Sequence, residues 1–135
     1  MRPTLATDGL VTIQGKKIVL IKRAKEPFLD KLVMPGGHVE SDDSSVAIAC
    51  ARELEEEIGL QIDPQNLKLL TVLDSPDRDP RPGRLISIVY RIDLESEPLL
   101  KAATDAKEVV IRNLNELTAD EIGFDHWQAI KLVIK

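Results

Sequence analysis

Runs of apolar residues, short enough for strands, alternate along the chain with polar, proline-containing and glycine-containing segments. Residues 4–13, 17–21 and 85–94 are rich in aliphatic and β-branched side chains, a composition that predicts strands. The first two are separated by a three-residue turn, so they can form a hairpin. Shorter strands are predicted at residues 67–73 and 108–111.

Between these strands the apolar spacing becomes helical. Asp43 or Ser44 is a favourable start for this helix, and Gly59 is a natural C-terminal stop. A second, closing helix is predicted over residues 124–134. Strands, a helix, more strands and a last helix predict an α/β or α+β sandwich with a mixed sheet, in one domain spanning residues 1–135. The apolar stripe of the first helix consists of Val46, Ala47, Cys50, Ala51, Leu54 and Ile58.

Composition narrows the classes of function. The net charge is −5 over 135 residues, which argues against non-specific binding to nucleic acid. Cys50 is the only cysteine, so no internal disulfide can form, and its apolar neighbours predict a buried residue rather than a nucleophile. No signal peptide and no membrane-spanning run is visible. We therefore expect a cytoplasmic protein that binds neither membranes nor nucleic acid.

Carboxylates are concentrated around the first helix, where seven fall between Glu40 and Glu57 with Arg52 as the only accompanying Lys or Arg. In a regular helix Glu53 and Glu57 lie about 40° apart around the axis, and Glu56 lies about 60° to the other side of Glu53. Such a face either stays in solvent or receives a cation. Oxygen ligands suit Mg²⁺, which can polarise a phosphoryl oxygen and lower the pKa of bound water. The pattern thus favours attack of water on a phosphoanhydride, with Arg52 orienting a neighbouring carboxylate.

Residues 35–37 (Pro-Gly-Gly) and residues 52–60 (Arg-Glu-Leu-Glu-Glu-Glu-Ile-Gly-Leu) together resemble the signature of the Nudix hydrolases. The resemblance implies an α/β/α sandwich around a mixed sheet, and hydrolysis of a nucleoside diphosphate linked to another group. It also implies that Glu53, Glu56 and Glu57 surround Mg²⁺ or Mn²⁺, with the carbonyl of Gly37 nearby.

The sequence departs from the signature at one point. Gly37 and Arg52 are fifteen positions apart, whereas the family spacing is fourteen. The simplest account is one extra residue in the loop 41–45, with Asp43 in place of the first glutamate. We expect Asp43 to cap the helix or to pair with Arg52, and not to bind metal.

Two further segments resemble the ADP-ribose pyrophosphatases of this superfamily: residues 77–81 with the strand 85–90, and residues 124–126. On this resemblance the products are AMP and ribose 5-phosphate. Asp79 and Arg81 become candidates for substrate contact, although the same residues also fit a plain turn. Glu108 is the candidate further ligand or general base. Asp105 and Glu116 are alternatives.

Other interpretations stay open. The runner-up within the enzyme class is a nucleoside triphosphate pyrophosphatase acting on damaged nucleotides, and outside it a non-catalytic sensor of a nucleotide metabolite. We expect Glu55 to be merely solvated, and His38 and His126 to be structural. Phe124 and Trp127 are expected in the core rather than stacked on a base. A small nucleotide is the expected partner, and by analogy with relatives we expect a homodimer.

Overall fold

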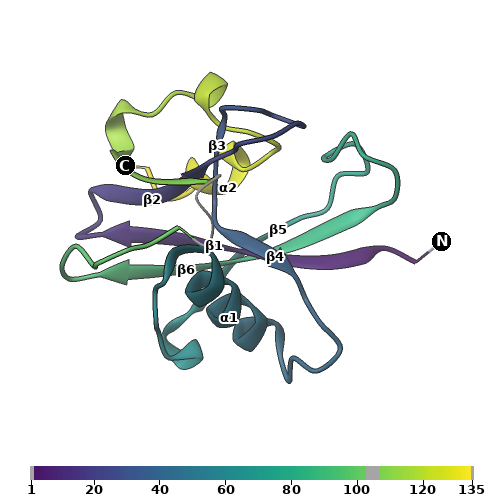
Figure 1. The fold of residues 1–135 in the computed structure, drawn as a ribbon, viewed down its shortest axis with the longest axis horizontal. Helices are drawn as coiled ribbons and strands as arrows, with labels where there is room; N and C mark the ends of the chain where they lie inside the picture. The colour runs from purple at the N-terminus through teal and green to yellow at the C-terminus, as the bar shows by residue number, and fades with distance from the viewer. Residues whose placement is uncertain (1, 103–106, 135) are drawn as a thin grey trace.

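The computed structural model describes residues 2–102 and 107–134, which form a seven-stranded mixed sheet with one helix on each side (Figure 1). The strand order is β3-β2-β1-β6-β5, and β4 pairs with β1 while β7 pairs with β2. The strands are β1 (Thr4–Ile13), β2 (Lys17–Lys22), β3 (Leu32–Val33), β4 (Gly36–His38), β5 (Lys68–Leu73), β6 (Leu85–Leu94) and β7 (Glu108–Asn113). The helices are α1 (Val46–Ile58) and α2 (Trp127–Ile130), with 3₁₀ turns η1 (Pro64–Asn66), η2 (Leu114–Glu116) and η3 (Ala119–Glu121).

β1 is the centre of the sheet. It runs parallel to β6 along its whole length, from Thr4 opposite Leu85 to Ile13 opposite Leu94. It runs antiparallel to β2 and to β4, so the predicted hairpin is confirmed and the sheet is mixed. This arrangement confirms the fold class predicted from the sequence.

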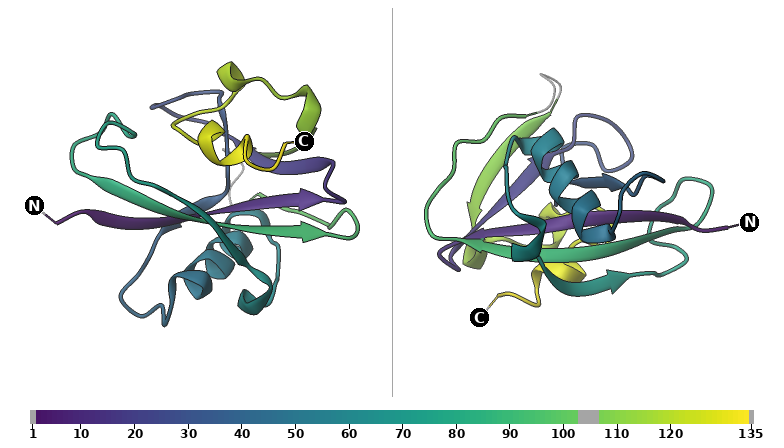
Figure 2. Two further views of the ribbon diagram at one scale, coloured as in Figure 1. Left: turned by 180° about the vertical axis from the view of Figure 1, so that it is seen from behind. Right: turned by 90° about the horizontal axis from the view of Figure 1, so that it is seen from below.

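The two helices lie on opposite faces of the sheet (Figure 2), and an apolar core lies under each of them. Along β2 the side chains alternate strictly, because successive residues of a strand point to opposite faces. Ile18 and Leu20 join the core that contains α2, whereas Val19 and Ile21 join the core that contains α1. Cys50 of α1 is fully buried, and burial raises the pKa of its thiol to about 12, as suits a core residue.

Helix α1 begins two or three residues later than the sequence predicted. Ser45 is the N-cap, and its side chain accepts the Ile48 N–H at 3.1 Å. The expected start at Asp43 or Ser44 is wrong because the Asp43 carboxylate is turned toward Arg52 instead. The stop at Gly59 is confirmed, and its φ of 71° is the left-handed conformation that favours glycine.

The closing helix is much shorter than expected. Only Trp127–Ile130 is α-helical, where residues 124–134 were predicted. Phe124 has a φ of 52°, which is incompatible with a continuous α-helix, so the chain turns there before α2 begins.

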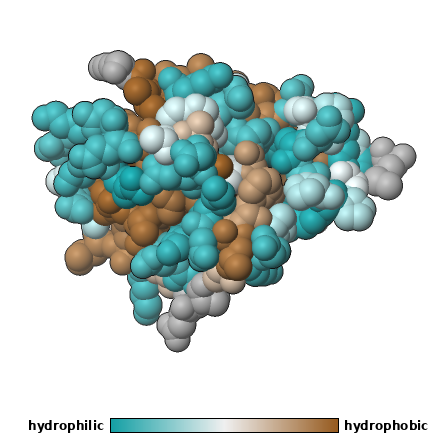
Figure 3. Space-filling model, turned by 90° about the horizontal axis from the view of Figure 1, so that it is seen from above, coloured by the Kyte–Doolittle hydropathy of each residue, from teal (hydrophilic) through white to brown (hydrophobic). Residues whose placement is uncertain are grey.

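On the face seen from above, apolar patches lie between hydrophilic residues (Figure 3). No helix within the described ranges has both the length and the apolar character needed to cross a membrane.

Candidate active site

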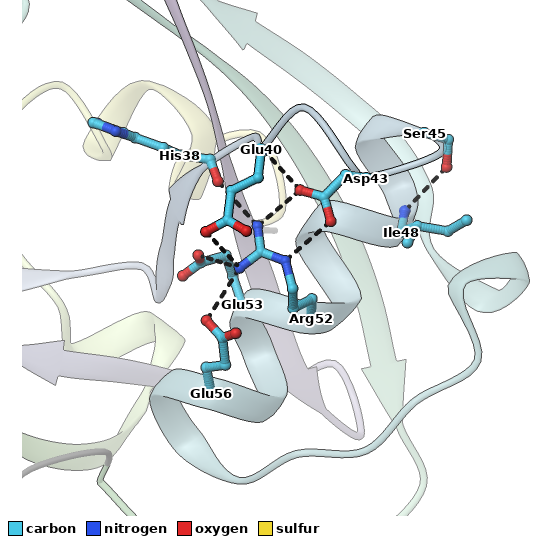
Figure 4. Close-up of polar contacts among 8 residues, drawn as sticks. All are labelled: His38, Glu40, Asp43, Ser45, Ile48, Arg52, Glu53 and Glu56. Atoms are coloured by element: carbon cyan, nitrogen blue, oxygen red, sulfur yellow. Dashed lines mark hydrogen bonds and ion pairs between the residues drawn. The ribbon is translucent and has the colours of Figure 1, made fainter.

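Arg52 holds together the carboxylates at the exposed side of α1 (Figure 4). Its Nη1 donates to Glu53 at 2.9 Å and to Glu56 at 3.1 Å. Its Nη2 donates to the backbone carbonyl of His38 at 3.1 Å, which ties α1 to the end of β4. The arginine therefore neutralises the acidic face and links it to the strand that carries Gly37.

Asp43 completes this network. Its two oxygens accept from Nε and Nη2 of Arg52 at 3.0 and 2.8 Å, a bidentate pair. The hydrogen bond from Arg52 holds the pKa of Asp43 below its usual range and is also the main reason the pKa of Arg52 is raised. The one-residue expansion of the loop thus places an acid against Arg52, as the sequence suggested.

Glu53 lies between Arg52 and the backbone of β4. It is the most buried of the three predicted metal ligands, with a side chain 11% exposed. Burial raises the pKa of its carboxyl, and the hydrogen bond from Arg52 opposes that rise. A Cβ atom placed on Gly37 would lie 2.5 Å from the Glu53 Cδ. Position 37 therefore has room for glycine only while Glu53 keeps this position.

Glu57 pairs with Lys107 of the segment before β7. Both of its carboxylate oxygens accept from Lys107 Nζ, at 3.0 and 2.8 Å. Within residues 2–102 and 107–134, no three acidic, histidine or cysteine side chains converge to hold a metal ion. The carboxylates of α1 are nevertheless oxygen ligands of the kind that Mg²⁺ and Mn²⁺ prefer. Each carboxylate is already met by a cation, Arg52 or Lys107.

A cavity of about 490 Å³ opens beside Gly37 and Glu57. We call it the arginine cavity, because three arginines line it. Its basic side chains outnumber its acidic ones although the whole chain is acidic, which suits an anionic ligand. The basic residues are Arg23, Lys25, Arg78, Arg81 and Lys107, and the acidic ones are Asp8, Glu57 and Asp79.

The two motifs that resembled ADP-ribose pyrophosphatases meet at this cavity. Arg78 donates to both oxygens of Asp125, at 3.0 and 2.9 Å, and its side chain is only 3% exposed. Arg81 in turn donates to Asp79 through Nε at 3.0 Å and Nη2 at 2.7 Å. Hydrogen bonding from the Arg81 side chain lowers the pKa of Asp79. Residues 47 positions apart are thereby joined beside the acidic helix.

The structure does not bring every predicted residue together. Glu108 lies at the start of β7 and lines a different hollow, of about 470 Å³, with Lys22 and Asp120. Glu116 belongs to η2 and lines neither the arginine cavity nor that hollow. Asp105 lies outside the described residues. A role for Glu108 as ligand or base therefore gains no geometric support from this arrangement.

Sequence reasoning missed a buried polar network at the floor of the arginine cavity. Met34 N–H donates to Nδ1 of His126 at 3.0 Å, and Nε2 of His126 lies 3.6 Å from Asp8 Oδ2. Ser87 donates to the same Asp8 oxygen at 2.5 Å. This network fixes the backbone just before Gly36. One signal in the sequence was Asp8, the one charged residue of β1.

The His126 network predicts a stability that falls with acid. Burial lowers the pKa of His126 below 6.5, more than Asp8 raises it, so the unfolded chain binds the proton first as the pH falls. The contribution of His126 to the free energy of unfolding is complete above the pKa that the histidine has in the unfolded chain. It decreases below that pKa, by at most about 1.4 kcal/mol at pH 5.5. Thermal unfolding between about pH 7.5 and 5.5 measures the loss. The decrease should be smaller in His126→Gln. An equal decrease in both proteins would contradict the role of His126.

These features define a Nudix-type domain, with a mixed sheet between two helices and a carboxylate-bearing helix beside a Gly-Gly segment. Residues 2–133 match the model of the NUDIX domain family. The chain belongs to this family, which confirms the resemblance found in residues 37–60.

Named relatives support this assignment to the NUDIX family. The chain is 44% identical over 131 residues, 97% of its length and 73% of the relative's, to an ADP-ribose pyrophosphatase of Methanocaldococcus jannaschii. It is 30% identical, with a TM-score of 0.84, to a bifunctional NMN adenylyltransferase/ADP ribose pyrophosphatase of Francisella tularensis. It covers 98% of its own length there and 40% of that chain. The Nudix domain of Shewanella oneidensis NrtR, solved with ADP ribose, shares the fold at 20% identity and a TM-score of 0.77, over 97% of this chain and 86% of that one. The predicted enzyme class, a Nudix pyrophosphohydrolase, is supported by the first two relatives.

Proposed function

We propose that this protein hydrolyses the pyrophosphate bond of ADP-ribose to AMP and ribose 5-phosphate, with Mg²⁺ as the metal. The observation that supports this proposal is that an acidic surface lies next to a cavity rich in basic residues. The acidic face of α1, held by Arg52, adjoins a cavity in which basic side chains outnumber acidic ones. A pyrophosphate needs both, because a metal and fixed cations must share its negative charge.

Each residue has a proposed part. Glu53, Glu56, Glu57 and the Gly37 carbonyl would hold Mg²⁺ or Mn²⁺, which supplies charge neutralisation and an acidified water. Arg52 positions Glu53 and Glu56. Asp79 and Arg81 form one wall of the arginine cavity and would contact the substrate. The named relatives favour this substrate: a 44% identical protein is called an ADP-ribose pyrophosphatase, and a solved relative at 30% identity was crystallised with AMP and an Mn ion.

The test measures release of AMP and ribose 5-phosphate with Mg²⁺ for the native protein and for Glu57→Gln. Glutamine removes one carboxylate ligand and the Lys107 ion pair, so activity should fall at least about tenfold. A panel containing ADP-ribose, other nucleoside diphosphate derivatives and oxidised nucleoside triphosphates ranks the substrates. Inactivity of the native protein on the whole panel, or full activity of Glu57→Gln, would refute the proposal. Tight ADP-ribose binding without turnover would instead indicate a sensor.

Homodimerisation remains a prediction made by analogy. Sedimentation of the purified protein at several concentrations measures it, and the expected mass is twice the 15.0 kDa of one chain. A monomeric mass at all concentrations would contradict it.

A further inference from the structure

Helix α1 covers only part of its side of the sheet. It lies along β1 and leaves β5 and the adjoining part of β6 uncovered, as the view from below shows (Figure 2, right). β5 is the last strand in the order β3-β2-β1-β6-β5, and within the described residues no strand pairs with its outer edge. The α1 side of β5 and β6 therefore faces outward without a cover.

The strand register identifies the side chains on this uncovered side. Residues paired on neighbouring strands share a side of the sheet, and so do residues two apart on one strand. Tyr90 packs in the core that contains α1, which fixes the α1 side of β6. The residues of β1, β5 and β6 that share this side and remain exposed or half-buried form one connected set, which we call the apolar face: Leu5, Leu69, Val72, Ile86, Ile88 and Tyr90.

The apolar face exposes a continuous patch without a charged side chain. Leu69 is 63% exposed, Val72 45% and Leu5 36%, and the other three residues are half-buried. Together they expose roughly 350 Å² of apolar surface, and a contiguous patch of this size often marks an interaction site. Residues 69–73 of β5 also lack the Lys, Glu or Pro that commonly protects an exposed edge strand.

We propose that the apolar face is a dimer interface, which packs against the same face of a second copy of this chain. A standard interface buries about 800 Å² on each partner, and about 65% of a homodimer interface is apolar. The roughly 350 Å² of the apolar face supplies about two thirds of that apolar share. A twofold axis brings the same residues of both copies together, and an uncharged face permits this without repulsion.

A second copy fits this face better than a lipid surface does. Proteins that lie on membranes combine apolar residues with Lys and Arg, which attract anionic lipids. The apolar face has no basic member, and the chain carries a net charge of −5. The proposed interface does not depend on the proposed function.

Sedimentation equilibrium of the native protein, Leu69→Lys and Val72→Lys tests this interface. The native protein should have twice the 15.0 kDa mass of one chain. Each lysine should raise the dissociation constant of the dimer at least about tenfold, because the interface would bury a charge without a partner. Both positions are exposed in the single chain, so circular dichroism should show an unchanged fold.

Leu132→Lys is the matched control. Leu132 is 55% exposed and follows α2, on the opposite side of the sheet. This variant should keep the native dissociation constant, because its position lies outside the apolar face.

Cross-linking provides a second measurement that introduces no charge. With a short bis-maleimide, Leu69→Cys or Val72→Cys should give a covalent dimer, whereas Leu132→Cys should not. Cys50 should not react, because it is fully buried.

A monomeric native protein would overturn this inference, and its sedimentation with vesicles of phosphatidylcholine and phosphatidylglycerol would assign the face to a lipid surface instead. Native dissociation constants in both Leu69→Lys and Val72→Lys, or equal weakening by Leu132→Lys, would overturn the location of the interface. None of these results bears on ADP-ribose hydrolysis, which the substrate panel tests separately.

Discussion

Replacing Glu53 by glutamine is expected to lower kcat/KM for ADP-ribose about 1000-fold, or about 4 kcal/mol in the activation free energy. The carboxylate is the most buried of the three proposed metal ligands and lies against Gly37. Glutamine has the same shape but no charge, so it cannot bind a divalent cation with comparable strength. A steady-state assay of AMP release at saturating Mg²⁺ measures the loss.

The fold should survive this substitution. Arg52 keeps its bidentate pair with Asp43 and its contact with Glu56. A buried amide also avoids the cost of a buried charge, which raises the pKa of Glu53. The unfolding temperature should therefore change by no more than about 3 °C. Glu55→Gln is the matched control, because Glu55 is exposed on the same helix and should keep full activity. Comparable loss in both variants would mean that helix charge, rather than Glu53, matters.

The sequence predicted those parts of the fold that depend on local pattern. β1 and β6 begin and end where the apolar pattern placed them. The pattern predicts these bounds because the apolar residues of each strand pack in a core. The predicted starts of α1 and α2 were wrong because contacts with residues distant in the sequence determine them. Asp43 is an acceptable N-cap, but nine residues away Arg52 offers it two hydrogen bonds, and Ser45 becomes the cap. Similarly, Phe124 leaves the helical conformation where its ring lies against Phe28 and two arginines.

In the site, too, the sequence predicted what depends on local spacing and not what depends on distant contacts. The acids of α1 share one helix, so their spacing alone predicted that they would lie together. The arginine cavity draws Arg23, Arg78 and His126 from three distant segments. Only the sheet topology and the Arg78–Asp125 pair bring those segments together, and neither has a signature in local spacing. The resemblance of residues 77–81 and 124–126 to ADP-ribose pyrophosphatases did indicate two of the three segments, without indicating that they touch.

Gly36 and Gly37 are required for a reason other than a positive φ. From the sequence, residues 35–37 predict a turn in which glycine allows either a positive φ or a close approach of the backbone to a ligand. Gly36 and Gly37 instead lie in β4, opposite Asp8 and Thr7 of β1, and neither has a positive φ. Glycine is required there because the neighbouring atoms leave no space for a side chain. A Cβ on Gly36 would meet the Thr7 carbonyl oxygen and lie 2.8 Å from the Asp8 Cα.

Gly36→Ala is therefore expected to lower the free energy of unfolding by about 3 kcal/mol, and the unfolding temperature by about 10 °C. The atoms that block the methyl group are largely backbone atoms of the central strand, which cannot move without disturbing the pairing of β1 with β6. Thermal unfolding followed by circular dichroism measures the change.

Two further glycine variants distinguish the effect of backbone conformation from that of steric contact. Gly15→Ala tests conformation alone, because Gly15 has a φ of 64° and open space around it, and it should cost about 1 kcal/mol. Gly37→Ala tests the site, because its methyl group would meet the Glu53 carboxylate, the movable end of a side chain. It should reduce activity more than stability, as is also expected of Glu53→Gln. If Gly36→Ala were as stable as Gly15→Ala, β4 could not be packed against β1 as closely as the structure has it, and the placement of Gly37 against Glu53 would lose its support.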